Sequence, residues 1–241
     1  KRPMDEMAMG FALPQEDEFA PCMDTLKSSY LGISFPRRQQ HFDRYLTFDD
    51  VPADEINDWK DSLLTFCKKL TYKYQRPLLL KSPSHTARIR HLLEWFPDAS
   101  FVHIHRHPHH VFRSCQHYWD TAVWYTYLQK PDRSNLDSEI LSRYRTLHDA
   151  FHAQRSLIPA ERFHELSFTD LESDPISSLR TIYQNLGLPH FETLRPTFEA
   201  YLASQSSYRK NQFTPLPPET LKLVNEIVKP ELDLWQYSPN P

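Results

Sequence analysis

Residues 78–114 constrain the fold more than any other part of this 241-residue chain. Residues 77–81 and 100–105 form two short apolar runs, and each is followed within a few residues by a proline that suits the first turn of a helix. The order predicts strand, helix, strand, helix. Strands that alternate with helices are typical of an α/β fold with a parallel sheet, so we expect that class here.

An arginine stands where the second of these strands ends. Arg106 closes the strand, Pro108 opens the next helix, and Ser114 follows Arg106 by eight residues. Ligands of parallel sheets bind outside the carboxyl ends of the strands. The guanidinium fork of arginine suits phosphate, because it donates two parallel hydrogen bonds. We therefore expect Arg106 and Ser114 to bind an anion beside the helix.

The charge distribution fits a small anion better than a nucleic acid. The net charge is −3, which argues against general nucleic-acid binding. Residues 84–118 nevertheless carry four arginines and eight of the thirteen histidines, against two acidic residues. The three cysteines form no CxxC pair, which fits a reducing cytoplasm. No apolar run approaches the ~18 residues of a transmembrane helix, so no membrane partner is expected.

The remaining pattern predicts further elements around this centre. Residues 1–50 indicate loops and short helices, and residues 52–74 a long amphipathic helix. Residues 82–95 indicate a helix with Ser82 as its N-cap. Further helices are expected from Pro108 onward and at 135–156, 174–186, 191–203 and 218–235, and a further strand at 162–168. We expect a single domain over residues 1–241.

Two more segments complete a recurring arrangement. Residues 161–189, ERFHELSFTDLESDPISSLRTIYQNLGLP, read as a strand, a short acidic element, an Asp-Pro helix start and a helix that ends in Leu-Gly-Leu-Pro. Phe168 leads the acidic element. Residues 208–211, Tyr-Arg-Lys-Asn, lie in a polar, basic loop and include Arg209 and Lys210.

These motifs resemble those of the sulfotransferases that use 3′-phosphoadenosine-5′-phosphosulfate, over roughly residues 78–215. The resemblance implies a parallel sheet flanked by helices, similar to that of P-loop kinases. It also implies a cofactor-binding site in which Arg106, Ser114, Arg209 and Lys210 hold the 3′-phosphate. Phe168 takes the place of a family tyrosine that lies against the adenine.

Candidate catalytic residues come from two other segments. Lys81-Ser82-Pro83-Ser84-His85 resembles the Lys-Ser-Pro-x-His element of the broad bacterial branch of the family. The resemblance implies that Lys81 neutralises charge near the sulfate and that His85 accepts the proton of the acceptor hydroxyl. Some sulfotransferases use a carboxylate as the base. Glu16 and Glu18, in the run Pro-Gln-Glu-Asp-Glu, are therefore the alternatives to His85.

The family's glycine-rich 5′-phosphosulfate loop is not found among these residues. The chain has three isolated glycines, where about 17 would be average. We expect the sequence to be the C-terminal part of a longer domain, with the loop upstream of Lys1 and an incomplete sheet with an exposed edge near residues 78–81 or 101–105.

Several functions stay open. The expected reaction moves a sulfuryl group to a hydroxyl or amine of a small-molecule or carbohydrate acceptor. A P-loop nucleotide kinase or a non-catalytic anion-binding protein is the alternative. The histidines of residues 103–110 invite a zinc site, but no nearby cysteine or carboxylate completes a ligand set, so no metal is expected.

Overall fold

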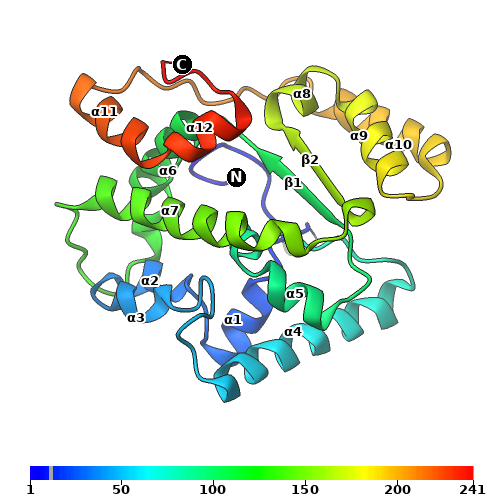
Figure 1. Ribbon diagram of the computed structural model, residues 1–241, viewed down its shortest axis with the longest axis horizontal. Helices are drawn as coiled ribbons and strands as arrows, with labels where there is room; N and C mark the ends of the chain where they lie inside the picture. Colours follow the sequence, from blue (N-terminus) through cyan, green and yellow to red (C-terminus); the bar gives the residue numbers. More distant parts are fainter. Residues whose placement is uncertain (11–12, 241) are drawn as a thin grey trace. The chain divides into compact units, whose positions relative to one another are not determined.

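The structure is a computed structural model that describes residues 1–10 and 13–240. Phe11 and Ala12, in the predicted N-terminal loop, lie outside the described residues, as does Pro241. The chain divides into two compact units (Figure 1). The first is Lys1–Trp95 with Cys115–Arg155, and the second is Phe96–Ser114 with Ser156–Pro241. The single domain expected from the sequence stays a prediction.

The first unit is helical in the residues that the structure describes. The long helix α4 follows Pro52, as predicted, and its first turn carries the acidic residues that favour a helix start. The helix α1 packs against α4, and α7 packs against the short helix η2. Its elements are α1 (Phe19–Thr25), α2 (Leu31–Ser34), η1 (Pro36–Arg38), α3 (Gln39–Asp43), α4 (Ala53–Tyr74), η2 (Pro83–Ala87), α5 (Ile89–Trp95), η3 (Val123–Thr126) and α7 (Leu136–Gln154), which ends before the short turn η4 (Arg155–Leu157).

The core of the first unit forms around an aromatic cluster on α4. Trp59 is fully buried and contacts the rings of Phe48 and Trp95, at centroid distances of 5.2 and 5.7 Å. The guanidinium of Arg88 lies over both Phe48 and Trp59, at 4.3 and 4.7 Å. A charged group thus occupies the middle of an apolar cluster, and it needs a counter-charge there.

Glu18 supplies that counter-charge. Its carboxylate accepts from both terminal nitrogens of Arg88, at 2.6 and 3.2 Å, and from the Ser28 hydroxyl at 2.6 Å. Neither side chain of the ion pair is exposed. The backbone carbonyl of Leu46 accepts from Nε of Arg88 at 3.2 Å, and the carbonyl of Tyr45 accepts from a terminal nitrogen. The buried pair therefore joins the start of α1 to residues 45–46 and to the segment before α5.

The second unit contains a two-stranded parallel sheet. Strands β1 (Phe101–His105) and β2 (Phe163–Ser167) pair in parallel, with Phe101 opposite Phe163. This confirms both predicted strands and their parallel direction. Side chains alternate along β1, and Val102 and Ile104 are 40% and 45% exposed. These two side chains lie on one face of the sheet, and the predicted incompleteness of the sheet stays a prediction.

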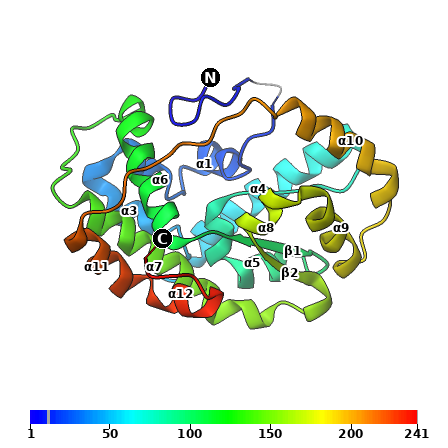
Figure 2. The same cartoon turned by 90° about the horizontal axis from the view of Figure 1, so that it is seen from above.

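Most helices of the second unit follow β2 along the chain, and α8 and α9 come directly after it (Figure 2). Ser167 caps the helix after β2 by accepting from the Asp170 N–H at 3.0 Å, and Asp174 caps the next helix by accepting from the Ser177 N–H at 3.1 Å. The elements are α6 (Pro108–Thr121), which continues into the first unit, η5 (Ala160–Arg162), α8 (Phe168–Ser173), α9 (Pro175–Asn185), α10 (Phe191–Ser204), α11 (Pro218–Ile227) and α12 (Lys229–Trp235).

Three sequence-based expectations need correction. Residues 77–81 are not a strand: β1 pairs only with β2 among the described residues, and Leu79 is 94% exposed. An extended segment with no neighbour to satisfy its backbone groups does not form a strand. The predicted helix at 82–95 is interrupted at Arg88 into η2 and α5. The expected helix 218–235 is likewise two helices, with a break at Val228, because Pro230 has no N–H to continue the hydrogen bonds of α11 and suits the first turn of a new helix.

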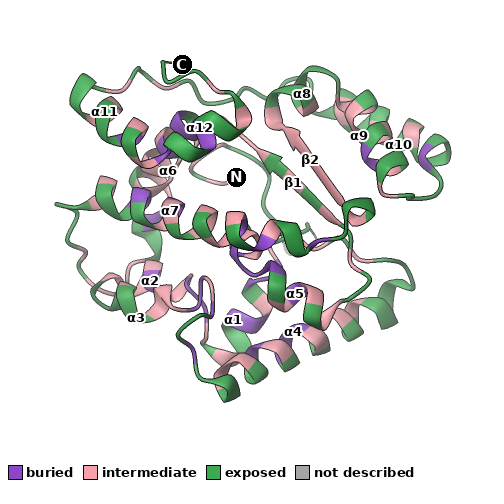
Figure 3. Cartoon of the chain, viewed as in Figure 1, coloured by how far each residue is buried: buried purple, intermediate pink, exposed green. Residues whose placement is uncertain are grey.

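Figure 3 shows that buried residues gather on the helices of the first unit, where the Arg88–Glu18 pair lies. We expect Glu18→Gln to lower the free energy of unfolding by about 3–5 kcal/mol, because it leaves the buried Arg88 charge uncompensated. Urea denaturation monitored by circular dichroism measures the change. Asp58→Asn is the matched control: the Lys27–Asp58 pair is equally short at 2.6 Å but partly exposed, so its loss should cost under ~1 kcal/mol. Equal denaturation midpoints for the two variants would contradict the prediction.

Candidate functional site

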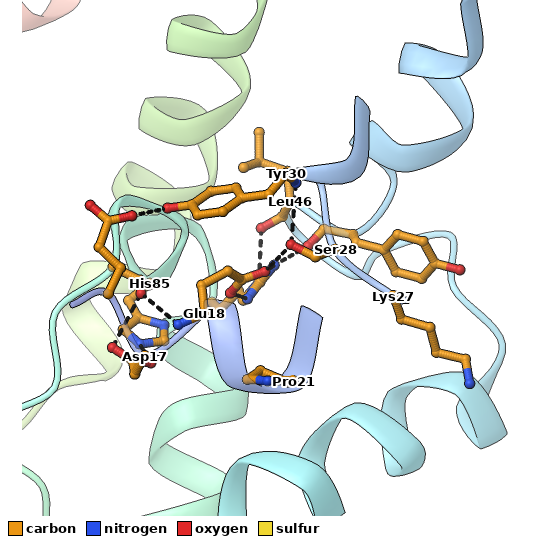
Figure 4. Close-up of polar contacts among 12 residues, drawn as sticks. Asp17, Glu18, Pro21, Lys27, Ser28, Tyr30, Leu46 and His85 are labelled. Atoms are coloured by element: carbon orange, nitrogen blue, oxygen red, sulfur yellow. Dashed lines mark hydrogen bonds and ion pairs between the residues drawn. The ribbon is translucent and has the colours of Figure 1, made fainter. Parts of the chain in front are cut away.

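Residues 16–18, an acidic run before α1, place their three carboxylates against three different basic side chains (Figure 4). Glu18 is the N-cap residue of α1, and its carboxylate is held by Arg88. Glu16 and Asp17 precede it and contact residues 81–85 instead. The structure therefore brings Glu16 and Glu18 close to the predicted Lys81 and His85 segment, within the first unit.

Glu16 forms an ion pair with Lys81 and accepts a hydrogen bond from the Tyr30 hydroxyl. The Lys81 side chain is 72% exposed and Glu16 is 25% exposed. Burial, and then the neighbouring Glu16 carboxylate, raises the pKa of Tyr30 far above its usual value. Tyr30 therefore remains a neutral donor, and Glu16 has a positive and a neutral partner on its two oxygens. The exposed Lys81 ammonium has three N–H donors, so an anion could bind it beside Glu16 or in place of Glu16.

Asp17 is the partner of His85. Its Oδ2 lies 2.7 Å from Nε2 of His85, and its Oδ1 accepts from the Ser82 hydroxyl at 3.1 Å. Burial raises the pKa of Asp17, but the hydrogen bond and charge of His85 and the Ser82 hydroxyl outweigh it, so the pKa lies below its usual range. Asp17 is thus a carboxylate at neutral pH. The second ring nitrogen of His85, Nδ1, is buried and has no hydrogen-bond partner among the described residues.

The sequence analysis missed Asp17. It stands between the two candidate bases, Glu16 and Glu18, and its partner His85 lies 68 residues further along the chain. Ser82 was expected to cap a helix, yet it makes no capping hydrogen bond and binds Asp17 and the Glu18 backbone instead. Within the first unit the structure places His85 in a chain of hydrogen bonds with a carboxylate, an arrangement that suits a general base.

In the second unit the strand-end arginine meets an aromatic ring. The Arg106 guanidinium lies over Phe168 at 4.8 Å, and the Lys210 ammonium lies over the same ring at 5.8 Å. Lys210 also forms an ion pair with Glu172 at 2.5 Å. Three residues predicted for one nucleotide site therefore come together from the end of β1, the start of α8 and the basic segment after α10.

The electrostatics of this cluster favour an anion. His110 lies one helical turn before Ser114 on α6. Burial lowers the pKa of His110, and the positive charges of Arg106 and Lys210 lower it further. A nearby anion would offset the positive charges that disfavour protonated His110.

Ser114 and Arg209 are exposed, and neither is hydrogen-bonded to Arg106 in the described residues. Arg106 and Lys210 thus both contact the Phe168 ring. Ser114 lies one turn after His110 on α6, and Arg209 is next to Lys210 in sequence.

A contact that the sequence did not reveal ties the basic segment to α6. Arg113 donates to the Thr214 hydroxyl at 3.0 Å, and its guanidinium lies over Phe213 at 5.8 Å. Arg113 belongs to the predicted basic region, but its partners lie about 100 residues further on, in a loop with no periodic pattern. The contact holds the loop after Lys210 against the helix that carries Ser114.

The histidines of residues 103–110 have separate partners in the second unit. His103 contacts Glu165 at 3.0 Å, His105 contacts the Tyr237 hydroxyl at 2.8 Å, and His109 contacts Asn225 at 2.7 Å. His105 also stacks on Trp235 at 4.5 Å. No group of three or more metal-ligating side chains occurs in residues 1–10 and 13–240. These histidines therefore hold the C-terminal helices and tail against β1 and α6.

None of the described helices is both long enough and apolar enough to cross a membrane.

The fold belongs to a known class. The crystal structure of sulfotransferase STF9 from Mycobacterium avium matches the structure with a TM-score of 0.74, over 93% of this chain and 57% of that chain, at 19% sequence identity. The match confirms the predicted α/β fold class.

Sequence comparisons identify the family. The profile of the Sulfotransferase family matches residues 10–193. The chain is 37% identical over 243 residues to omega-hydroxy-beta-dihydromenaquinone-9 sulfotransferase Stf3 of Mycobacterium bovis, and equally to the protein of that name in Mycobacterium tuberculosis. Each match covers 100% of this chain and 62% of the relative, so the chain spans less than two thirds of their length. The chain belongs to the sulfotransferase family, which confirms the resemblance seen in its motifs.

The buried environment of His107 leads us to expect that the folded protein is less stable in acid. Burial lowers the pKa of His107 to about 4, although Nε2 donates to the Ser238 carbonyl at 2.9 Å. In the unfolded chain its pKa is about 6.5, so the unfolded state takes up the proton first. The stability that depends on neutral His107 is therefore complete above pH ~6.5 and is lost as the pH falls toward 4.

We expect the thermal midpoint of His107→Gln to fall less than that of the wild type between pH 7 and pH 4, because glutamine keeps an N–H donor and does not titrate. Differential scanning calorimetry measures both curves. His41→Gln, at an exposed position on α3, controls for the loss of an imidazole. Parallel curves for His107→Gln and the wild type would refute the assignment.

Proposed function

We propose that the chain belongs to an enzyme that transfers a sulfuryl group from 3′-phosphoadenosine-5′-phosphosulfate to a hydroxyl acceptor. The observation that carries the proposal is the cluster of Arg106, Phe168 and Lys210 at the end of β1. It combines two cations and an aromatic face, which are the groups that a nucleotide with an extra phosphate needs. Family membership supplies the reaction class.

The second-unit residues bind the nucleotide in this proposal. Arg106 donates its guanidinium fork to the 3′-phosphate, and Lys210 adds a second positive charge. Ser114 adds a hydroxyl donor from the same helix face as His110. Arg209 lies next to Lys210 in an exposed segment and closes on the same phosphate. Phe168 gives its ring to the adenine, without the hydroxyl of the family tyrosine.

The first-unit residues act on the acceptor and the sulfuryl group. The acceptor oxygen forms a bond to sulfur while the bond from sulfur to the 5′-phosphate oxygen breaks, and adenosine 3′,5′-bisphosphate leaves. Transfer of this in-line kind depends on positioning and on stabilising charge at the equatorial oxygens. His85 takes the proton of the acceptor hydroxyl, and Lys81 turns from Glu16 toward the sulfuryl oxygens. No metal enters this proposal.

The three candidate bases differ in their surroundings. Both carboxylate oxygens of Glu18 are bound by Arg88 and Ser28, and the side chain is fully buried. Glu16 is bound by Lys81 and Tyr30. His85 has a free ring nitrogen, so we assign the base to His85 and keep Glu16 as the alternative. Glu18 has a structural role in this proposal.

The acceptor is a hydroxylated molecule with an apolar or aromatic part. The relative at 37% identity is named for an omega-hydroxylated menaquinone derivative, which is lipid-like. Trp124 and Tyr125 stack at 3.8 Å and remain 52% and 65% exposed, so they offer an aromatic surface rather than core packing. A hydroxylated prenyl or aromatic compound therefore fits the proposal better than a carbohydrate.

The nucleotide assignment is tested by comparing two ligands. Arg106→Ala should weaken binding of adenosine 3′,5′-bisphosphate by at least tenfold more than binding of AMP, because only the first ligand has a 3′-phosphate. Isothermal titration calorimetry measures both affinities. Arg180→Ala is a matched control, since Arg180 also lies over a phenylalanine ring, Phe191, at 5.2 Å in the same unit. Equal losses for both ligands would instead favour the kinase alternative, in which a 3′-phosphate has no role.

The base assignment is tested by turnover. A positioned general base is worth ~10²–10⁴ in rate, so His85→Ala should reduce kcat by that order and leave the affinity for adenosine 3′,5′-bisphosphate unchanged. Transfer of ³⁵S from the labelled donor to an omega-hydroxy prenyl quinone, in the full-length protein, measures kcat. Glu16→Gln is the competing variant. A fully active His85→Ala together with an inactive Glu16→Gln would move the base to Glu16.

A further inference from the structure

A one-way chain of hydrogen bonds leads from the protein backbone to His85. The backbone N–H of Glu18 donates to Oγ of Ser82 at 3.0 Å, Oγ donates to Oδ1 of Asp17 at 3.1 Å, and Oδ2 of Asp17 lies 2.7 Å from Nε2 of His85 (Figure 4). Asp17 and Ser82 are buried, at 4% and 7% exposure. Bulk water therefore has little access to reorganise the chain.

The direction of each hydrogen bond follows from what its two groups can donate or accept. A backbone N–H can only donate, so Ser82 accepts from it and directs its own hydrogen to Asp17. An ionised carboxylate can only accept, so Asp17 requires a hydrogen on Nε2 of His85. The carboxylate form of Asp17 is favoured at neutral pH, as shown above. The imidazole has no freedom to present an unprotonated Nε2 to this carboxylate.

We propose that the Glu18–Ser82–Asp17 chain fixes neutral His85 as its Nε2–H tautomer, so that Nδ1 is the nitrogen that accepts the proton of the substrate hydroxyl. Asp17 is a positioning residue in this scheme, because it acts through His85. The catalytic half of the inference rests on the proposed function. The tautomer itself does not, and it can be measured without substrate.

The free nitrogen is the second observation that supports this assignment. Nδ1 of His85 is buried and has no hydrogen-bond partner among the described residues. A buried polar atom without a partner is costly, so its presence points to a role in the working protein. The Nε2–H tautomer places the lone pair on that atom, ready to accept a hydrogen bond from an acceptor hydroxyl.

The hydrogen-bond chain starts at Glu18, which lies in the buried core of the first unit. Glu18 lies at the start of α1, and its carboxylate forms the buried ion pair with Arg88. Its backbone N–H therefore has a fixed position and direction. Hydrogen bonds through Ser82 and Asp17 therefore hold the ring of His85 in one orientation. The ring then needs little rearrangement when a substrate binds.

Asp17→Asn tests the tautomer. The Ser82 hydroxyl keeps the amide oxygen at the Oδ1 position, so the amide NH₂ faces His85 and donates to Nε2. We expect His85 to switch to the Nδ1–H tautomer, as seen in ¹⁵N-edited NMR of the labelled imidazole at pH 8 on the ligand-free protein. Glu165→Gln is the matched control: it alters the carboxylate that faces His103 at 3.0 Å and should leave the His85 signals unchanged.

Asp17→Ala is the second variant, in case Asp17→Asn does not fold. It removes the carboxylate that requires a hydrogen on Nε2, so we expect the Nε2–H signal of His85 to be accompanied by the Nδ1–H signal. A wild-type His85 that is Nδ1–H or doubly protonated at pH 8 overturns the inference. So does an Asp17→Asn variant that keeps the Nε2–H tautomer.

Kinetics of the full-length protein separate this inference from the proposed function. A switched tautomer should lower kcat by ~10²–10⁴ with little change in KM for the donor, since a wrong histidine tautomer removes the base but not the binding groups. A switched tautomer with unchanged kcat would leave the hydrogen-bond chain in place and overturn the assignment of His85 as base. An unchanged tautomer with reduced kcat would overturn the chain alone.

Discussion

The buried ion pair between Arg88 and Glu18 is the interaction on which the first unit depends. A charge without water needs a full set of hydrogen bonds, and the pair collects them from Ser28 and from the carbonyls of residues 45 and 46. The rings of Phe48 and Trp59 then close around the guanidinium. Five separate stretches of the chain meet at one charged centre, which fixes the start of α1 relative to the segment before α5.

That ion pair explains why three successive acidic residues have three different partners. With Glu18 held in the core, Asp17 and Glu16 are presented one after the other to His85 and Lys81. In the second unit, cations gather instead of carboxylates. Arg106 and Lys210 both lie over the ring of Phe168, and Lys210 also forms an ion pair with Glu172. The three acidic side chains of the first unit thus pair with other groups of the protein, whereas two cations of the second unit gather at one aromatic ring.

The sequence predicted the local elements well and the long-range pairs poorly. The caps at Ser167 and Asp174, the helix after Pro52 and the strand before Arg106 follow from neighbouring residues, and all are present. Residues 77–81 have the apolar pattern of a strand but no neighbour to pair with, which pattern alone cannot reveal. Asp17–His85 and Arg113–Thr214 join residues 68 and 101 positions apart, so no periodicity could indicate them. Family resemblance predicted Arg106, Phe168 and Lys210 for one site. The structure places both cations over the Phe168 ring, and their role in binding stays a prediction.

The stacking of Arg106 on Phe168 has a consequence for the entropy cost of capturing an anion. A free arginine side chain has ~2 kcal/mol of rotamer entropy to lose when it is immobilised. The Arg106 guanidinium already lies 4.8 Å from the centre of the Phe168 ring. This contact restricts the side chain before any ligand arrives, so a ligand that uses the same conformation would pay less of the entropy cost of ordering it.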